Sequence, residues 1–324
     1  MVKYYVLLLT ASVLFSMQFV FTKCYQKAKG SGFFYSLIFG IIVSFVSVPL
    51  FFVVNKCKFE FSLVSLGLAC VYAFINIALS AFSTKALSCA DLSLFSLSML
   101  LGGMVVPFIY GICMGEAVTV WKIIAVIAVT ASLFVSMKKN GEKKTSVLAV
   151  VCIAAVFILN GLSGVIVSFH QQKVENAVSS GAFMMLINAA RFAISVAVIV
   201  IIAIRNKIVV GSVDGEIKCF DRYYELSSPD GAIAANDQSS KKQEAKKWLV
   251  AIAVSVGFAV VNGVGNFFTT VSAANVPAVV MYPIITGCGV LFSSLFGLFF
   301  GEKITARTII SVVLVLFGTV LMMF

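Results

Sequence analysis

GEAVTVWKII, residues 115–124, and GEKITARTII, residues 301–310, are two closely similar charged segments, each lying between two long apolar runs. They are 186 positions apart, and at this offset the chain aligns with itself over three apolar stretches without a gap. The aligned pairs include Asn76 with Asn262, Gly103 with Gly289 and Glu116 with Glu302. Further upstream an offset of 149 applies, since it aligns the Ser-Gly pair at 31–32 with the one at 180–181.

The two offsets differ by the length of an insertion. The difference of 37 equals the excess of the 43-residue polar segment 205–247 over its six-residue counterpart at 55–60. We therefore interpret the chain as one five-helix unit written twice, in residues 1–140 and 146–324, with 205–247 as a solvated loop inserted into the second copy. Because five is odd, the second copy enters the membrane from the opposite side, which is the inverted repeat typical of secondary transporters.

The composition places the chain in a membrane. It is 61% hydrophobic and only 11% charged, with a mean hydropathy of +1.08, whereas soluble domains are about a quarter charged. We predict an all-α polytopic protein of the plasma (inner) membrane with a retained first helix. Its ten transmembrane helices are expected near residues 3–22, 33–54, 61–83, 92–113, 120–137, 146–169, 182–204, 248–269, 276–300 and 304–323.

Small residues recur every four positions before each Gly-Glu pair. The rows are Gly103, Pro107, Gly111 and Gly115 in the first half, and Gly289, Ser293, Gly297 and Gly301 in the second. Such rows let helix backbones approach closely in lipid, so we assign the glycines to helix packing. Glu116 and Glu302 fall at helix junctions just before the next span, where a carboxylate can cap free backbone N–H groups.

These features resemble a known family of carriers. A Gly-studded helix, then GEAVT or GEKIT, then a last apolar helix is similar to the EamA-type carriers of the drug/metabolite transporter superfamily. The opening LLLTASVLFSMQFVFTK also resembles their first helix, although the Trp common there is absent. The resemblance covers nearly the whole chain except 205–247, and it implies a ten-helix carrier without naming a substrate.

Arg191 is the charge that the sequence places inside a span, and Asn188 lies one turn before it on the same face. Their counterparts at offset 149 are the apolar Ile42 and Phe39, so the copies differ here. A buried guanidinium can hold a carboxylate or phosphate through two parallel hydrogen bonds. The alternative is a structural Arg that is bonded to backbone carbonyls or water.

Other polar residues could line the same site. Asn262 and Asn266 share a face of their helix, and Asn76 is the first-half counterpart of Asn262. Further candidates for substrate binding are Tyr72, Asn160, Gln18 and Tyr282. For each of them the alternative is a hydrogen bond between helices, because polar side chains often join membrane helices.

Several functions are disfavoured. No Asp or Glu lies in the middle of a span, which argues against proton antiport of cationic drugs through a buried carboxylate. The sequence has no phosphate loop, no His/Cys ligand cluster and no catalytic Ser/His/Asp set, so we expect no enzyme activity, no cofactor and no metal.

The lone His170 is expected at a solvated helix end. The net charge of +11 comes from residues between spans, so the expected partners are a small-molecule substrate and the bilayer, not nucleic acid, with the protein a monomer or homodimer.

Charge and resemblance disagree about orientation. The loops on the N-terminal side carry five Lys or Arg and those on the opposite side carry eighteen. The positive-inside rule therefore predicts both ends outside, whereas ten-helix relatives usually have both ends inside.

The sequence thus predicts a carrier with a midplane site around Asn188, Arg191, Asn262 and Asn266. The rival hypothesis is a non-transporting sensor or assembly protein that acts through 205–247. Deleting 205–247 separates the two: the carrier keeps its uptake in liposomes, whereas the rival loses its function.

Overall fold

The protein is a bundle of helices. The computed structural model describes residues 2–29, 32–89, 92–136, 147–210, 237–299 and 306–322, and these ranges contain helices and no strands. The helices are α1 (Val2–Lys29), α2 (Phe33–Val54), α3 (Leu63–Cys89), α4 (Leu92–Cys113), α5 (Val120–Ser136), α6 (Val147–Lys173), α7 (Ser180–Val210), α9 (Asp237–Ala273), α10 (Ala278–Phe299) and α11 (Ala306–Leu321). Six of them, α1, α2, α3, α6, α7 and α9, are long and apolar enough to cross a membrane.

The bundle has an apolar outside. Large side chains such as Phe45, Phe74 and Leu249 are 67%, 66% and 70% exposed, which a water-soluble protein avoids over so wide a surface. In lipid every backbone N–H and C=O must be bonded within the protein, and the helix does this within a single segment. Long apolar helices with apolar outer faces therefore suggest a membrane protein.

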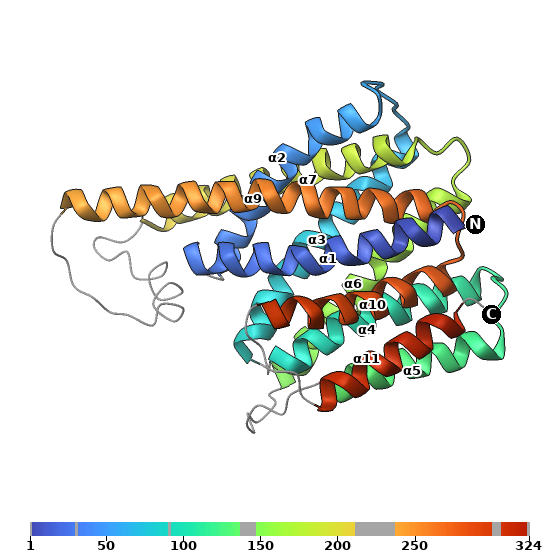
Figure 1. Ribbon diagram of the computed structural model, residues 1–324. Coiled ribbons are helices and arrows are strands. Elements are labelled where there is room, and N and C mark those ends of the chain that lie inside the picture. Colours follow the sequence, from blue (N-terminus) through green and yellow to red (C-terminus); the bar gives the residue numbers. More distant parts are fainter. Residues whose placement is uncertain are drawn as a thin grey trace.

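The helices lie roughly along one axis (Figure 1). The start of α1 and the end of α11 lie at the same end of the bundle, together with the connections at 55–62, 114–119, 174–179 and 274–277. We call this the terminal end. At the opposite end, α9 extends beyond the other helices (Figure 1).

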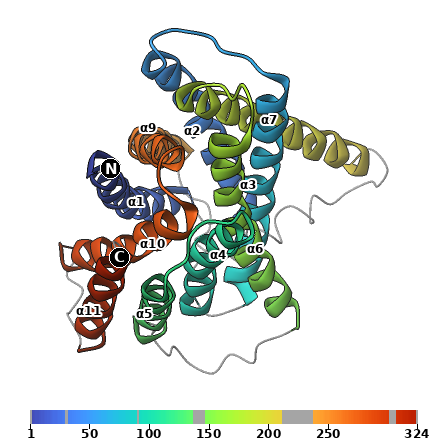
Figure 2. The ribbon, with the colours of Figure 1, turned by 90° about the vertical axis from the view of Figure 1, so that its right-hand side faces the viewer.

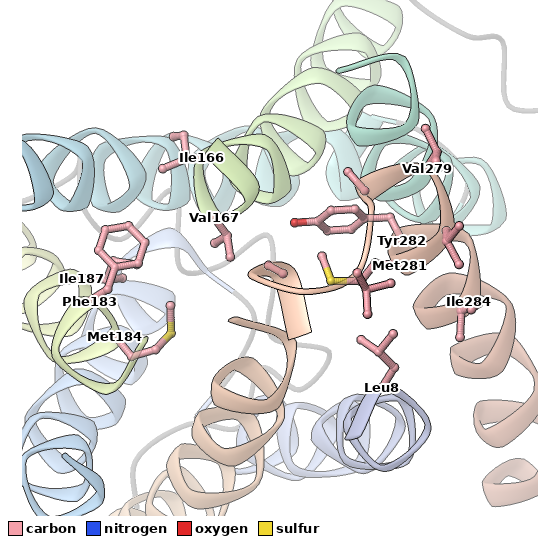
Figure 3. Packing of buried hydrophobic residues seen from close by; sticks show 14 of the residues in the cluster. Leu8, Ile166, Val167, Phe183, Met184, Ile187, Val279, Met281, Tyr282 and Ile284 are labelled. Atoms are coloured by element: carbon pink, nitrogen blue, oxygen red, sulfur yellow. The ribbon is translucent and has the colours of Figure 1, made fainter. Parts of the chain in front are cut away.

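Packing follows a regular set of pairs (Figure 2). α1 packs against α9 and α10, and α6 packs against α3 and α4. The other main pairs are α2 with α7, α3 with α7, α4 with α10 and α5 with α11. A large buried apolar cluster forms where the beginnings of α7 and α10 meet the end of α6 and Leu8 of α1 (Figure 3).

The spans predicted at 33–54 and 92–113 coincide with α2 and α4. The solvated loop expected at 205–247 is wrong in its extent, because α7 continues to Val210 and α9 already begins at Asp237. The segment 241–247, KKQEAKK, is made of good helix formers. Helix α9 therefore begins before its apolar part, and only 211–236 of the insertion lies outside the described residues.

Gly115 ends α4 through its backbone conformation. Its φ is +77°, the left-handed region that glycine adopts without steric cost. The N–H of Gly115 donates to the Ile112 carbonyl and that of Glu116 to the Gly111 carbonyl, both at 3.0 Å, which is the Schellman pattern. A Cβ at Gly115 would meet nothing within 4 Å, so this glycine does not have the packing role that the sequence predicted.

Glu116 caps a helix, but a different one from the helix that the sequence indicated. Its Oε1 accepts the Ala278 N–H and its Oε2 the Val279 N–H, both at 2.9 Å. These donors belong to α10, in the second half of the chain, and not to α5, which follows Glu116. The Schellman turn aims the carboxylate across the bundle, so the α4–α5 connection is tied to the start of α10. Gly301 and Glu302 lie outside the described residues.

Helices α4 and α6 approach each other closely. A Cβ at Gly102 would collide with the backbone carbonyl of Phe157, and one at Gly161 would collide with the Val106 Cβ. The sequence analysis had named the neighbouring Gly103, where a Cβ would lie 2.8 Å from the Asn160 Nδ2. Both glycines therefore face α6, and Gly102 makes the tighter contact.

The remaining glycines of the two rows differ from one another. A Cβ at Gly111 would collide with Glu116 and Val279. A Cβ at Gly289 would meet nothing within 4 Å. Gly289 instead accepts the Ser16 hydroxyl on its carbonyl at 3.1 Å. Gly297 lies near the end of α10.

Gly102→Ala should lower the stability of the folded protein by about 1–3 kcal/mol, because the added methyl group has no room against the Phe157 carbonyl. Gly67→Ala is the matched control, since a Cβ there meets nothing within 4 Å. That change should raise the stability by about 0.5–1 kcal/mol through the better helix propensity of alanine. Thermal unfolding in detergent measures both; equal shifts would contradict the packing analysis.

Glu116→Gln should destabilise the protein by at least about 1 kcal/mol, because the amide loses one of the two acceptors for the N-terminus of α10. Glu175→Gln, an exposed site in another connection at the terminal end, should change the stability by less than about 0.5 kcal/mol. An unfolding temperature of the Glu116 variant equal to that of the Glu175 variant would show that the cap does not stabilise the fold.

Candidate functional site

Arg191 lies in the apolar part of α7. Within the described ranges its guanidinium makes no hydrogen bond and no ion pair. Protein surrounds it, yet part of its surface remains accessible. A charge held inside an apolar bundle is costly unless a partner of opposite charge or several hydrogen bonds compensate it. The guanidinium is therefore the group in this bundle best suited to receive a ligand.

Helix α2 leaves room for this guanidinium at Gly40. A Cβ at Gly40 would lie 3.4 Å from Nη2, 3.7 Å from Nε and 3.9 Å from Cζ of Arg191. Three guanidinium atoms at nearly equal distances mean that the planar group faces the α2 backbone. The glycine thus lets the two helices approach around the charged side chain.

Tyr72 lies on α3, which packs against α7, the helix that carries Arg191. Asn76, one turn further along α3, donates its amide to the Tyr72 carbonyl at 3.0 Å. Asn188 on α7 likewise donates to the Met184 carbonyl of its own helix at 2.8 Å. These residues place a phenol and amide groups on the two helices that meet at Arg191, and both amide donors are bonded within their own helix.

Asn262 and Asn266 bind each other. The Asn266 amide donates to the Asn262 Oδ1 at 2.9 Å and to its carbonyl at 2.8 Å. Among the described residues no hydrogen bond joins either side chain to Arg191 or Asn188. The two asparagines of α9 are therefore hydrogen-bonded to each other and not to the guanidinium of Arg191.

Asn160 and Tyr282 join helices to one another. The Asn160 amide donates to the Met99 carbonyl of α4 at 2.6 Å. The Tyr282 hydroxyl donates to the Gly164 carbonyl of α6 and lies 3.3 Å from the Ser168 Oγ. Figure 3 shows the Tyr282 ring directed from α10 toward α6. Of the two roles that the sequence left open for these residues, the observed bonds are those of helix packing.

Gln18 remains without a partner. Its carbonyl accepts the Thr22 hydroxyl at 2.9 Å, but no hydrogen bond of its side-chain amide occurs in the described parts of the chain. Gln18 and Arg191 are thus predicted site residues whose side chains make no hydrogen bond among the described residues.

His170 is buried, whereas the sequence predicted a solvated helix end. It is 0% exposed, and its ring stacks on that of Phe183 at a centroid distance of 3.5 Å. Its Nε2 lies 2.9 Å from the Ser65 Oγ, and its Nδ1 lies 3.0 Å from the Gln171 Nε2. The beginnings of α3 and α7 cover the end of α6, a contact that sequence position alone does not reveal.

Polar contacts that the sequence did not predict hold the start of α7. The Ser179 N–H donates to the Glu60 carboxylate at 2.6 Å, and the Ser179 hydroxyl donates to the Asn55 Oδ1 at 2.7 Å. The hydrogen bond from the Ser179 N–H holds the pKa of the Glu60 carboxyl below its usual range, because it stabilises the charged form. The connection between α2 and α3 therefore ties down α7, the helix that carries Arg191.

No protein-family model and no curated protein matches this chain. Solved structures do match its fold. One of them, a crystal structure of another protein, covers 98% of this chain and 96% of its own, with a TM-score of 0.66 at 12% sequence identity. A likeness at this identity shows a shared fold.

Proposed function

We propose that this protein is a secondary transporter, a ten-helix carrier made of two inverted five-helix repeats that moves a small polar or anionic metabolite by alternating access. The observation that carries the proposal is the guanidinium of Arg191, which lies inside an apolar bundle and has no partner among the residues that the structure describes. An intramembrane charge without a protein partner is typical of a substrate or ion pathway.

The packing pairs support the inverted repeat. If α6 is the counterpart of α1 and α9 that of α3, then the α1–α9 pair corresponds to α6–α3. In the same way, α1–α10 corresponds to α6–α4, and both members of each pair are observed. Three further pairs, α2–α7, α4–α10 and α5–α11, join helices of equal rank in the two halves. Such a two-fold relation is expected of a carrier that alternates between two equivalent packings.

The resemblance of the sequence to EamA-type carriers is consistent with this architecture. It rests on the repeated Gly-Glu junctions and the small-residue helices before them. The junction at Glu116 also connects the halves physically, because its carboxylate holds the first turn of α10. We therefore infer that the junction is a structural element of the carrier, whereas Arg191 belongs to its binding site.

A thermal-shift screen of the purified protein against metabolites identifies a ligand, because a compound that binds only the folded state raises the apparent stability. Arg191→Ala should then weaken an anionic ligand by about 2–3 kcal/mol, or roughly 30- to 150-fold in Kd. A neutral analogue should lose much less, since it forms no charged hydrogen bond with the guanidinium. Equal losses for both ligands would exclude the anion site, and the control Asn160→Ala should perturb folding rather than this ratio.

A further inference from the structure

Ser44 carries a buried hydroxyl without a partner. The residue is 0% exposed, and its Oγ makes no hydrogen bond within the described residues. Helical hydroxyls elsewhere in the bundle donate to the carbonyl four positions earlier, as those of Ser80, Ser163 and Ser255 do. The Ser44 hydroxyl makes no such bond to Gly40. Since an unmade hydrogen bond at a buried site is unfavourable, the hydroxyl is a donor suited to a ligand.

Helix register brings Ser44 to the site. Helices α2 and α7 run antiparallel, because the end of α2 at Asn55 lies against Gly181 at the start of α7. Further along the pair, the rings of Phe45 and Phe192 lie 6.0 Å apart, and Gly40 faces Arg191.

Residues four apart share a face of a helix. Ser44 therefore lies on the same face of α2 as Gly40, the face that is directed toward Arg191. Because the helices are antiparallel, the turn of α2 with Ser44 is level with the turn of α7 that carries Asn188. The free hydroxyl and the free guanidinium consequently border the same region between α2 and α7.

The charge of this region is small. Arg191 is the cation in the middle of an apolar segment, whereas the other Lys and Arg of the described helices lie toward segment ends, as Lys85 and Lys173 do. One guanidinium balances one negative charge. A dicarboxylate or a phosphate dianion would leave a second, uncompensated charge in the bundle, which is costly in a medium of low dielectric constant.

We propose that Ser44, Arg191 and Tyr72 form a binding site for a monocarboxylate. The Arg191 fork donates two parallel hydrogen bonds to the carboxylate oxygens. The Ser44 hydroxyl from α2 and the Tyr72 hydroxyl from α3 donate to the remaining lone pairs. The inference rests on the proposed transport function and narrows its substrate class.

The test uses the purified full-length protein and four probe sets: the monocarboxylates from acetate to hexanoate, the dicarboxylates and alkyl phosphates of the same chain lengths, and the neutral amides. Thermal unfolding reports binding, and uptake into proteoliposomes reports transport. We expect monocarboxylates to bind and the other three sets to bind at least about 10-fold more weakly.

Dianions that bind as well as monocarboxylates would overturn the inference.

Ser44→Ala separates a ligand role from a packing role. It should weaken monocarboxylate binding about 10- to 100-fold, the loss of one hydrogen bond to a charged group. The unfolding temperature without ligand should stay unchanged or rise, because a buried hydroxyl without a partner is removed. Tyr72→Phe should act in the same direction on binding.

Ser255→Ala is the matched control, because that buried hydroxyl donates to the Ala251 carbonyl at 2.7 Å. It should lower the unfolding temperature and leave binding unchanged. Unaltered affinity in Ser44→Ala would overturn the site assignment. Uptake of only neutral or dianionic compounds would overturn the monocarboxylate site and leave the proposed transport function standing. Absence of any uptake or binding across a wide metabolite screen would overturn both the site and the transport function.

Discussion

In an apolar medium, every backbone polar group must find its partner inside the protein, and the rest of this structure depends on that constraint. It makes the long apolar segments helical. It also determines what polar side chains do there, because a hydroxyl or amide without a partner is as unfavourable as a free N–H group. Thr22 and Ser255 therefore bond to their own helices, and Asn160 bonds to a neighbouring helix. Against this background a free polar group in the interior is informative.

Hydrogen bonding divides the candidate residues in a way that residue type does not. Asn160 and Tyr282 connect helices, and Asn262 pairs with Asn266. These groups are occupied in the observed packing, so each would have to give up a bond before it contacts a substrate. The guanidinium of Arg191 makes no hydrogen bond with any residue that the structure describes. The proposed binding site is therefore centred on α2, α3 and α7.

The sequence predicted much of the fold because hydropathy reports the solvent around a helix directly, and the bounds of α2 and α4 were correct. The helix bounds were predicted less well where a helix extends beyond its apolar part, as α9 does at Asp237. Hydropathy does not report such an extension, because Lys, Glu and Gln form good helices in water. Arg191 was found because a charge in an apolar run is visible in the sequence. The partner of Glu116 was not, because the first turn of α10 is distant in the chain and backbone donors leave no mark in the sequence. Ser44 was missed for a related reason: a serine among apolar residues is ordinary, and only the missing bond distinguishes it.

Gly40 gives the site a mechanical property. Because three guanidinium atoms lie at contact distance from the position of its missing Cβ, the charged group itself acts as the spacer between α2 and α7. In the proposed carrier, a guanidinium that held an anion could not move toward it without changing the distance between α2 and α7. The affinity for the proposed anion and the packing of α2, in the first half of the chain, on α7, in the second half, would then depend on the same side chain.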